Sequence, residues 1–290
     1  MSQINRKRES RAFLRSAEQI PEHIAFIMDG NRRYAHQKGK EADYGHAAGV
    51  SAVENMLHWT YLAKIKHITI YAFSTENFKR DPSEVENIFE LLEKMLCKIS
   101  ADEKILKKKI RIRMIGETGS LPEKTLKTFK ELEEKTAGND KMFLNVALAY
   151  GGRGDITQAF ERIAEDTVYN KEEKPAGGIL SDEELSKYLF PFSDEIVPGV
   201  DFLIRTGDER RTSNFLPWQA NGNNAVVCYY SKFWPEFTFK DLFYTLRIYG
   251  RAIEERRKDE ARRQKKIDAF LADLKSCDAA ARAEQPVLRK

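Results

Sequence analysis

The pattern of apolar and polar positions predicts an alternation of short buried strands and amphipathic helices. Runs rich in β-branched and aromatic residues predict strands at 23–28, 67–73, 110–116, 141–150, 200–204 and 225–230. Apolar residues at helical spacing predict helices at about 44–63, 82–99, 121–136, 156–166 and 182–189. Such an alternation is typical of a mostly parallel sheet flanked by helices, so we expect a single α/β domain with a central six-stranded sheet.

The two ends of the chain differ from this central part. Residues 1–20 are polar with a small apolar foothold, which predicts a weakly docked helical extension. One long helix is predicted from Phe239 to about Leu274, and its second part is almost entirely charged, as in a solvated or partner-bridging helix. The expected organisation is an extension at 1–20, a main domain at 21–250, and a charged helix at 251–290 whose tail is disordered from Asp278.

Three of the predicted strands end in dense polar segments. The first ends in Asp29-Gly30-Asn31-Arg32-Arg33, the second in 74–80 (STENFKR) and the fifth in 205–214 (RTGDERRTSN). Because ligands bind at the carboxyl ends of parallel strands, these segments are candidate binding residues. A carboxylate beside arginines suits Mg²⁺ and phosphate, and 205–214 is the clearest diphosphate-binding candidate. For the first segment alone, an ordinary turn with solvated arginines is an equally good interpretation.

Three features near these segments have competing interpretations. Asp81-Pro82-Ser83-Glu84 fits a helix start in which Asp81 is the N-cap and Glu84 reaches back to it. His46 is a candidate phosphate contact, although a lone histidine is more often structural. The apolar face of the helix at 82–99 is more often core packing, and less commonly the wall of a long apolar cavity.

Composition excludes several classes of protein. The chain has 290 residues with 49 Lys+Arg against 45 Asp+Glu, and acids interleave the bases of the C-terminal helix, which argues against nucleic-acid binding. The three cysteines are far apart, so neither a zinc site nor a disulfide framework is predicted, and a cytoplasmic protein is expected. The charged N-terminus is unlike a signal peptide, and no apolar run is long enough to span a membrane.

The motifs together resemble a known family. They are HIAFIMDGNRRYA, GHAAGV, YAFSTENFKR, LNVALAYGGRGDI, DFLIRTGDERRTSNFLPWQ and FWPEF, in order over roughly residues 21–250. On these segments the chain resembles the cis-prenyltransferases, the family of undecaprenyl diphosphate synthase and dehydrodolichyl diphosphate synthase, and in some features the eukaryotic catalytic subunit. Synthases of the trans type use Asp-rich pairs on helices, and this chain contains no Asp-Asp pair.

The resemblance implies a role for each matching residue. Asp29 is expected to hold Mg²⁺ on the diphosphate of an allylic primer, with Asn31 and Asn77 as further catalytic residues and Asn77 assisting proton loss. Arg205, Arg211 and Ser213 are expected to hold isopentenyl diphosphate. The full implied substrate-binding set is Gly30, Asn31, Arg32, Arg33, Tyr34, His46, Ser74, Thr75, Glu76, Phe78, Arg80, Arg205, Arg211, Thr212 and Ser213.

The resemblance also implies the reaction and its setting. Isopentenyl diphosphate units would be added to an allylic primer, expected to be farnesyl diphosphate, giving a long-chain Z-polyprenyl diphosphate for dolichol or a similar glycosyl carrier lipid. A hydrophobic tunnel between the early helices and the sheet would hold the growing chain. The apolar product predicts peripheral contact with a membrane, which would be the endoplasmic reticulum in a eukaryote. A catalytically silent scaffold subunit is the alternative function.

Some residues depart from the bacterial pattern. Arg32 stands where bacterial members carry glycine, and bacterial members carry an arginine near the position of Ala42. In bacterial members a glutamate shortly before the WPxF segment is regarded as a second metal ligand, and residues 225–228 of this chain lack it. After Arg256-Arg257 the chain reads Lys-Asp-Glu and not the Arg-x-Gly motif of homodimeric members. We therefore expect either a homodimer or a heterodimer with a non-catalytic subunit that resembles the Nogo-B receptor.

Overall fold

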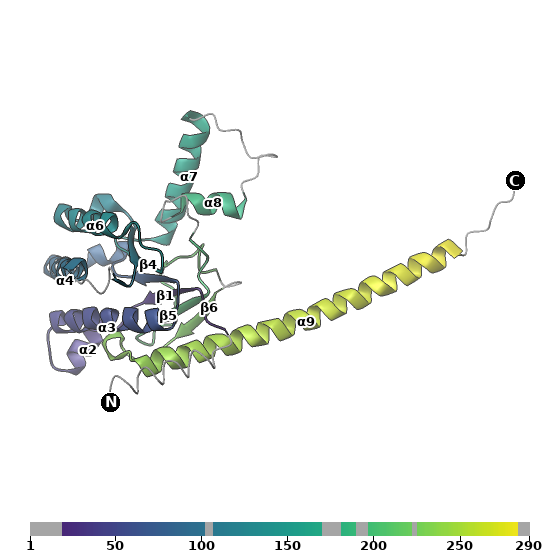
Figure 1. Cartoon of the computed structure of the whole chain (residues 1–290), viewed down its shortest axis with the longest axis horizontal. Coiled ribbons are helices and arrows are strands. Elements are labelled where there is room, and N and C mark those ends of the chain that lie inside the picture. The colour runs from purple at the N-terminus through teal and green to yellow at the C-terminus, as the bar shows by residue number, and fades with distance from the viewer. Residues whose placement is uncertain (1–18, 102–106, 170–180, 190–196, 222–224, 284–290) are drawn as a thin grey trace.

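All six strands of the central sheet run parallel, in the order β3-β4-β2-β1-β5-β6 (Figure 1). The computed structural model describes residues 19–101, 107–169, 181–189, 197–221 and 225–283. The strands are β1 (His23–Ile27), β2 (His67–Tyr71), β3 (Ile110–Ile115), β4 (Met142–Ala147), β5 (Phe202–Arg205) and β6 (Val226–Tyr229). The predicted single α/β domain with a six-stranded sheet is thereby confirmed.

Helices connect the strands and cover the sheet. They are α2 (Asn31–Gln37), α3 (Ala42–Leu62), α4 (Pro82–Ala101), α6 (Glu123–Thr136), α7 (Gly152–Tyr169), α8 (Asp182–Tyr188) and α9 (Phe239–Ala283). Short 3₁₀ helices are η1 (Thr75–Lys79), η2 (Thr118–Ser120) and η3 (Trp234–Glu236). α3, α4 and α6 lie side by side on one face of the sheet, as Figure 1 shows.

Alternate residues of each strand enter cores on opposite faces of the sheet. From β1, Ile24 and Phe26 join the larger core with α3, α4 and the first turns of α9, whereas Ala25 and Ile27 join the smaller core. The irregular segment after β5 closes the smaller core through Phe215. A strand buried on both faces reads as a continuous apolar run, which is why β1 is predictable. In β1 the polar side chains are confined to the two ends of the strand.

Two helix ends differ from the prediction for identifiable reasons. α7 begins at Gly152, four residues before the predicted start, because Asn214 caps it: the Gly152 N–H donates to the Asn214 carbonyl at 2.9 Å, and the Arg153 N–H donates to Asn214 Oδ1 at 3.0 Å. α9 continues to Ala283, whereas the chain was expected to be disordered from Asp278; for residues 278–283 that prediction is wrong. Alanine, the best helix former, dominates this stretch. Except for its last two residues, the extension predicted at 1–20 lies outside the described residues.

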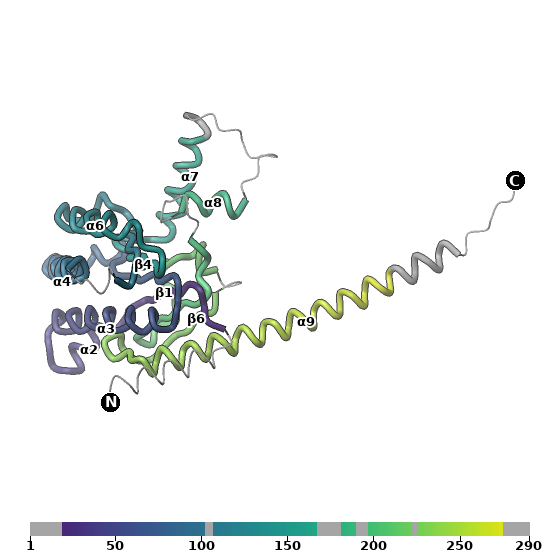
Figure 2. Tube along the Cα trace, viewed as in Figure 1, coloured from purple at the N-terminus to yellow at the C-terminus, as the bar shows by residue number. Residues whose placement is uncertain are grey.

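α9 has two parts with different surroundings. Its 45 residues make a helix about 68 Å long. Leu242, Leu246 and Tyr249 pack into the larger core, Ile253 packs against it, and Arg256 Nη2 donates to the Ala225 carbonyl at 3.1 Å. Beyond these residues the helix runs away from the domain (Figures 1 and 2). None of the helices in the described residues is long and apolar enough to cross a bilayer.

Buried histidines occupy the amino-terminal ends of the central strands. His23 Nε2 lies 2.8 Å from Thr69 Oγ1, and the His67 ring stacks on Phe143 with centroids 4.7 Å apart. Burial lowers the pKa of His23, and it lowers the pKa of His67 to about 3, with a further contribution from the neighbouring His23, Lys66 and Arg113. Both imidazoles are therefore neutral in the folded protein at neutral pH.

We expect the protein to lose stability as the pH falls below about 6.5. The unfolded chain takes up protons on these imidazoles near that pH, whereas folded His67 does so only at a pH of about 3. Protonation of His67 then lowers the free energy of unfolding by up to about 1.4 kcal/mol per pH unit within this window, and His23, whose pKa is also lowered, acts in the same direction. Urea unfolding across the window measures the slope. His67→Phe keeps a stacking ring and should flatten it, with the exposed His36→Phe as control; an equal slope in both variants would contradict the assignment.

Candidate active site

The three polar segments meet at the carboxyl edge of the sheet. Ile27, the last residue of β1, pairs with Tyr71 of β2 on one side and with Arg205 of β5 on the other. The chain runs from β1 to β2 in one direction and later returns to β5 in the opposite direction. The crevice between β1 and β5 is thus the topological switch point, where open α/β sheets bind ligands.

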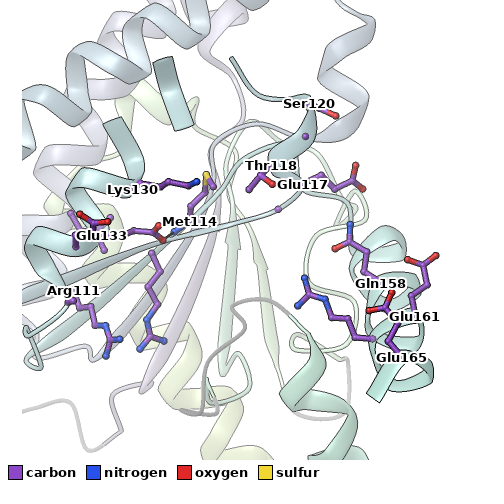
Figure 3. Close-up of a pocket in the computed structure, with 17 residues that line it drawn as sticks. Arg111, Met114, Glu117, Thr118, Ser120, Lys130, Glu133, Gln158, Glu161 and Glu165 are labelled. Carbon is purple, nitrogen blue, oxygen red and sulfur yellow. Dashed lines mark hydrogen bonds between the residues drawn. The ribbon is translucent and has the colours of Figure 1, made fainter. Parts of the chain in front are cut away.

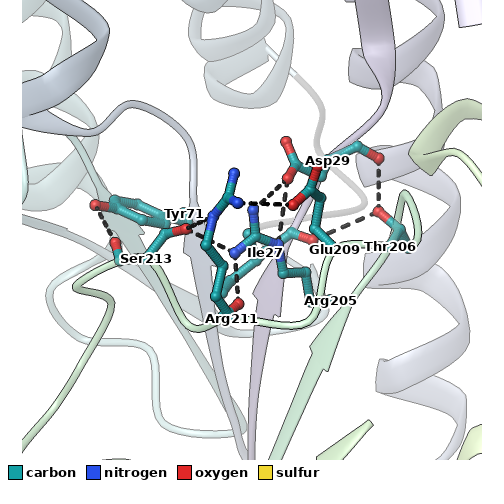
Figure 4. Close-up of polar contacts among 8 residues, drawn as sticks. All are labelled: Ile27, Asp29, Tyr71, Arg205, Thr206, Glu209, Arg211 and Ser213. Atoms are coloured by element: carbon teal, nitrogen blue, oxygen red, sulfur yellow. Dashed lines mark hydrogen bonds and ion pairs between the residues drawn. The ribbon is translucent and has the colours of Figure 1, made fainter. Parts of the chain in front are cut away.

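Asp29, Arg205 and Ser213 form a connected polar network at this crevice (Figure 4). Arg205 donates to Asp29 Oδ2 from Nη2 at 2.6 Å and from Nε at 3.2 Å. Arg205 Nη1 donates to Ser213 Oγ at 2.6 Å and to the carbonyl of Arg211. The Arg205 side chain is 4% exposed and that of Asp29 is 38% exposed. Arg205 therefore holds the Asp29 carboxylate at the edge while protein atoms enclose its own guanidinium.

The loop after β5 presents further cationic and hydroxyl groups in a strained conformation. Ser213 and Asn214 have backbone φ values of 49° and 59°, which residues other than glycine rarely adopt. Arg211 is 66% exposed; its Nη1 lies 2.9 Å from Glu209 Oε2, and its Nε donates to Ser213 Oγ at 3.3 Å. Of the two arginines predicted to bind isopentenyl diphosphate, Arg211 is the one that reaches solvent.

Gly207 allows the first and third segments to approach each other. Its φ is 86°, and a Cβ atom there would lie 2.7 Å from Arg33 Nη2 and 3.1 Å from Asp29 Cβ. The Arg33 guanidinium in turn lies 5.3 Å from the centroid of the Phe233 ring. Phe233 also fills the space beside Gly30, whose φ is 112°. Phe233 is missing from the predicted site, because an aromatic residue before Trp-Pro reads as core.

Asn31 directs its carboxamide toward α3. Its Oδ1 atom is buried and has no hydrogen-bond partner, and a Cβ on Gly49 would lie 2.6 Å from it. A buried amide oxygen without a partner is costly, so this residue is candidate ligand-binding machinery. The structure places Asn31 between the end of β1 and Gly49 of α3.

Glu84 gathers three of the predicted primer-binding residues around one carboxylate. Its Oε1 accepts from Arg80 Nη1 at 3.0 Å and lies 3.4 Å from His46 Nε2, while its Oε2 lies 3.6 Å from Arg32 Nη1. The predicted capping role of this side chain is therefore wrong, although Asp81 begins α4 as expected and accepts from the Ser83 N–H. Burial lowers the pKa of His46, and the hydrogen bond to Glu84 opposes that shift.

The segment after β2 is held by its own side chains. Ser74 begins η1, and its N–H donates to Asn77 Oδ1 at 3.0 Å in a capping box. Thr75 Oγ1 donates to Glu76 Oε2 at 3.4 Å. Phe78 is 37% exposed and packs edge-on against Phe73, with ring centroids 4.9 Å apart. The segment thus places an exposed ring and polar groups together at the end of β2.

Two other predicted site residues contribute to packing. Tyr34 stacks on Tyr44 with ring centroids 6.0 Å apart and an angle of 7° between the planes. The carbonyl of Thr212 accepts from the Phe215 N–H at 3.0 Å, which helps to turn the loop after β5.

The residues present suit a metal ion that arrives with its substrate. Within the described parts of the chain, no three His, Cys, Asp or Glu side chains gather as a metal site. Both hydrogen bonds from Arg205 fall on Oδ2 of the half-exposed Asp29. Mg²⁺ is usually held by one or two carboxylates together with substrate phosphates, so a single carboxylate fits a shared role.

A cleft elsewhere on the domain lies apart from this network. It has a volume of about 940 Å³ and is formed by the edge strand β3, the η2 turn, α6 and α7 (Figure 3). Its lining mixes both signs of charge, including Arg111, Lys130, Glu133 and Glu161. Two N–H groups of this edge strand have side-chain acceptors: Ile112 donates to Thr136 Oγ1 at 3.1 Å and Met114 donates to Glu133 Oε1 at 2.7 Å. None of the predicted site residues lines this cleft.

Replacing Glu84 with glutamine removes the negative charge from the cation cluster, which is the group of Arg32, His46 and Arg80 around Glu84. Without the carboxylate, Arg32 and Arg80 face each other with less compensation, so we expect a lower melting temperature in the absence of ligand. Inorganic diphosphate should then raise the melting temperature of E84Q more than that of the unsubstituted chain, because the anion replaces the lost charge. Glu86→Gln, at an exposed position of the same helix, is the matched control for thermal unfolding with and without diphosphate. Equal shifts in the two variants would show that diphosphate does not bind at this cluster.

Comparisons with known proteins agree on one family. Residues 27–258 match a family described as "Putative undecaprenyl diphosphate synthase". A tritrans,polycis-undecaprenyl-diphosphate synthase (geranylgeranyl-diphosphate specific) of Methanosarcina mazei is 42% identical over 260 residues, covering 88% of this chain and 85% of the relative. An isoprenyl transferase of Thermotoga maritima is 38% identical over 232 residues, covering 80% of this chain and 94% of the relative.

Solved structures show the same similarity. Lavandulyl diphosphate synthase from Lavandula x intermedia, in complex with dimethylallyl diphosphate, superposes with a TM-score of 0.71 at 28% identity, covering 79% of this chain and 95% of that one. A probable undecaprenyl diphosphate synthase from Campylobacter jejuni gives 0.63 at 28% identity, covering 80% and 95%. The parallel sheet, the polar crevice at its switch point and these similarities lead to one conclusion: the chain belongs to the cis-prenyltransferase family and is a prenyl-transferring enzyme.

Proposed function

We propose that this enzyme condenses isopentenyl diphosphate onto an allylic diphosphate primer and makes a long-chain Z-polyprenyl diphosphate for a glycosyl carrier lipid. The observation that carries the proposal is the Asp29–Arg205 pair at the switch point, with a cation cluster on one side and the loop with Arg211 and Ser213 on the other. Two anion-binding regions next to one carboxylate suit a reaction between two diphosphate esters.

The primer is assigned to the side of α2 and α4. Gly30, Asn31, Arg32, Arg33, His46 and Arg80 would surround its diphosphate, and Asp29 would share Mg²⁺ with it. Arg32, His46 and Arg80 already converge on Glu84, so their positions are set before substrate arrives. Mg²⁺, when bound, would stabilise the negative charge that develops as the allylic C–O bond breaks.

Isopentenyl diphosphate is assigned to the loop after β5. Ser213 and the exposed Arg211 would bind its diphosphate oxygens, because a guanidinium fork and a hydroxyl suit non-bridging oxygens. Arg205 donates to Asp29 and Ser213 in the structure, so we assign it the additional task of fixing the distance between the two diphosphates.

The reaction then needs no covalent nucleophile. The allylic C–O bond breaks to release diphosphate, the isopentenyl double bond forms a new C–C bond at the allylic carbon, and a proton leaves. Because Asn77 Oδ1 already accepts from the Ser74 N–H, we replace the expected assistance with proton loss: Asn77 is assigned to orienting the reacting diphosphate, and the released diphosphate takes the proton. Phe78 would lie against the reacting carbons.

The product chain is assigned to the apolar space under α3 and α4. Phe73, Phe78 and Phe89 form an aromatic cluster that leads from the end of β2 to α4, where Leu92 and Leu96 continue the apolar surface. The tunnel itself stays a prediction, as does the length of the product.

The name of a relative supports a different primer for this enzyme. Farnesyl diphosphate was expected, but the archaeal relative is named as specific for geranylgeranyl diphosphate. We therefore propose the longer primer. In a competition between equal concentrations of the two, we expect roughly tenfold more labelled product from geranylgeranyl diphosphate, a difference of about 1.4 kcal/mol. Preference for farnesyl diphosphate would reverse this assignment without affecting the family.

The oligomeric state and partner also remain predictions. A homodimer predicts full turnover by the purified chain alone, whereas a heterodimer with a Nogo-B receptor-like subunit predicts turnover only after that subunit is added. The scaffold alternative predicts no turnover in either case. It is disfavoured because Asp29, Asn77, Arg205 and Ser213 are present together.

A further inference from the structure

The outer part of α9 carries an apolar stripe that no described part of the chain covers. Ile267, Phe270, Leu271 and Leu274 are between 47% and 63% exposed. Residues three and four apart are neighbours on a helix surface, so these four side chains share one side of α9. They lie on the part of the helix that projects away from the domain (Figures 1 and 2).

The stripe is too short to pair with a second copy of α9. Extending its heptad pattern backward places Arg263 and Glu260 on the same side as Ile267. A stable coiled coil needs about three to four apolar heptads. Fewer than two are apolar here, because the charged side chains interrupt the seam.

The charges next to the stripe favour an anionic surface. Arg262, Arg263, Lys265 and Lys266 precede it directly, against two acids, Asp268 and Asp273, within it. Arg263 and Lys266 lie four residues before Ile267 and Phe270, so they adjoin the amino-terminal end of the stripe. An apolar stripe with adjacent cations is typical of a helix that lies in the interface of an anionic bilayer.

We propose that residues 262–274 of α9 bind the surface of an anionic bilayer. The stripe faces the acyl chains, and Arg263 and Lys266 lie at the phosphate headgroups. The inference rests on the proposed function in one respect only: a water-insoluble polyprenyl product has to enter a lipid phase, and a tethered enzyme delivers it there. Binding to lipid requires no turnover, so the two claims fail separately.

Sedimentation of the full chain with lipid vesicles tests the proposal. We expect binding to phosphatidylcholine vesicles that contain phosphatidylglycerol, and weaker binding to phosphatidylcholine alone. The double variant F270E/L271E should bind at least tenfold more weakly. Its matched control is A269E/A272E, which adds the same two charges to the same turns but on the opposite side of the helix, and which should keep most of the binding. Turnover in detergent should be unchanged in both variants.

Three results would overturn the proposal. The unsubstituted chain could fail to bind either kind of vesicle, or the two double variants could lose binding equally, which would make the interaction purely electrostatic. The third result would come from light scattering without vesicles. If the molar mass were lower for F270E/L271E than for the unsubstituted chain but unchanged for A269E/A272E, the stripe would be an interface between copies of this chain.

Discussion

Replacing Asp29 with alanine is expected to lower kcat for condensation by roughly 10³-fold while the fold stays intact. Asp29 offers a half-exposed carboxylate between the two proposed diphosphate sites, and within the described residues no cluster of other carboxylates or histidines replaces it as a metal ligand. Incorporation of labelled isopentenyl diphosphate over a range of Mg²⁺ concentrations measures the loss. Thermal unfolding checks the fold, because the substitution also removes the partner of Arg205.

Asp29→Asn separates the charge of this residue from its shape. The amide oxygen can still accept from Arg205, but the negative charge is gone. We expect D29N and D29A to lose kcat alike, because in the proposed reaction the negative charge on the oxygen that would hold Mg²⁺ is required. Recovery in D29N would assign Asp29 to positioning Arg205, and turnover of D29A within tenfold of the unsubstituted enzyme would remove Asp29 from the mechanism.

Arg205→Lys is expected to lower kcat/KM for isopentenyl diphosphate by about 100-fold, although the charge is kept. The guanidinium contacts Asp29 on one side and both Ser213 and the Arg211 carbonyl on the other. A lysine ammonium is a point charge on a flexible stem and cannot bridge both sides with a fork. Steady-state kinetics with each substrate varied in turn should show kcat and KM affected together.

Arg211→Lys is the matched control. Arg211 is mostly exposed and donates from the same loop. Because it acts as a direct ligand in the proposal, its substitution should raise the KM for isopentenyl diphosphate by roughly tenfold with a small change in kcat. If R205K behaved like R211K, Arg205 would be a simple ligand and the bridging role would be wrong.

The sequence predicts the parts of this protein that depend on local pattern. β1 and β2 are buried on both faces, so their apolar runs are continuous, and the polar segments that follow mark the carboxyl edge of the sheet. The register of β1 with β5 then brings Asp29 to Arg205, residues far apart in the chain. Parallel-sheet topology made this convergence predictable without any knowledge of side-chain contacts.

Long-range contacts account for what the sequence did not predict. Glu84 fits a local capping box, yet its carboxylate instead contacts Arg32 of α2, His46 of α3 and Arg80 at the end of η1. α7 begins early because Asn214 caps it from a distant loop. Phe233 belongs to the site because Gly30 and Arg33 pack on it. No spacing rule in the chain signals such partners, since each depends on how separate loops meet.

The most direct test of the central claim is product formation by the purified full-length chain. The assay supplies labelled isopentenyl diphosphate, geranylgeranyl diphosphate, Mg²⁺ and a little detergent, and resolves the product by chain length and double-bond geometry. We predict a long polyprenyl diphosphate whose newly formed double bonds are Z. Products with new E double bonds would contradict the proposed reaction. So would a complete lack of incorporation, with and without an added partner subunit, if E84Q still responds to diphosphate.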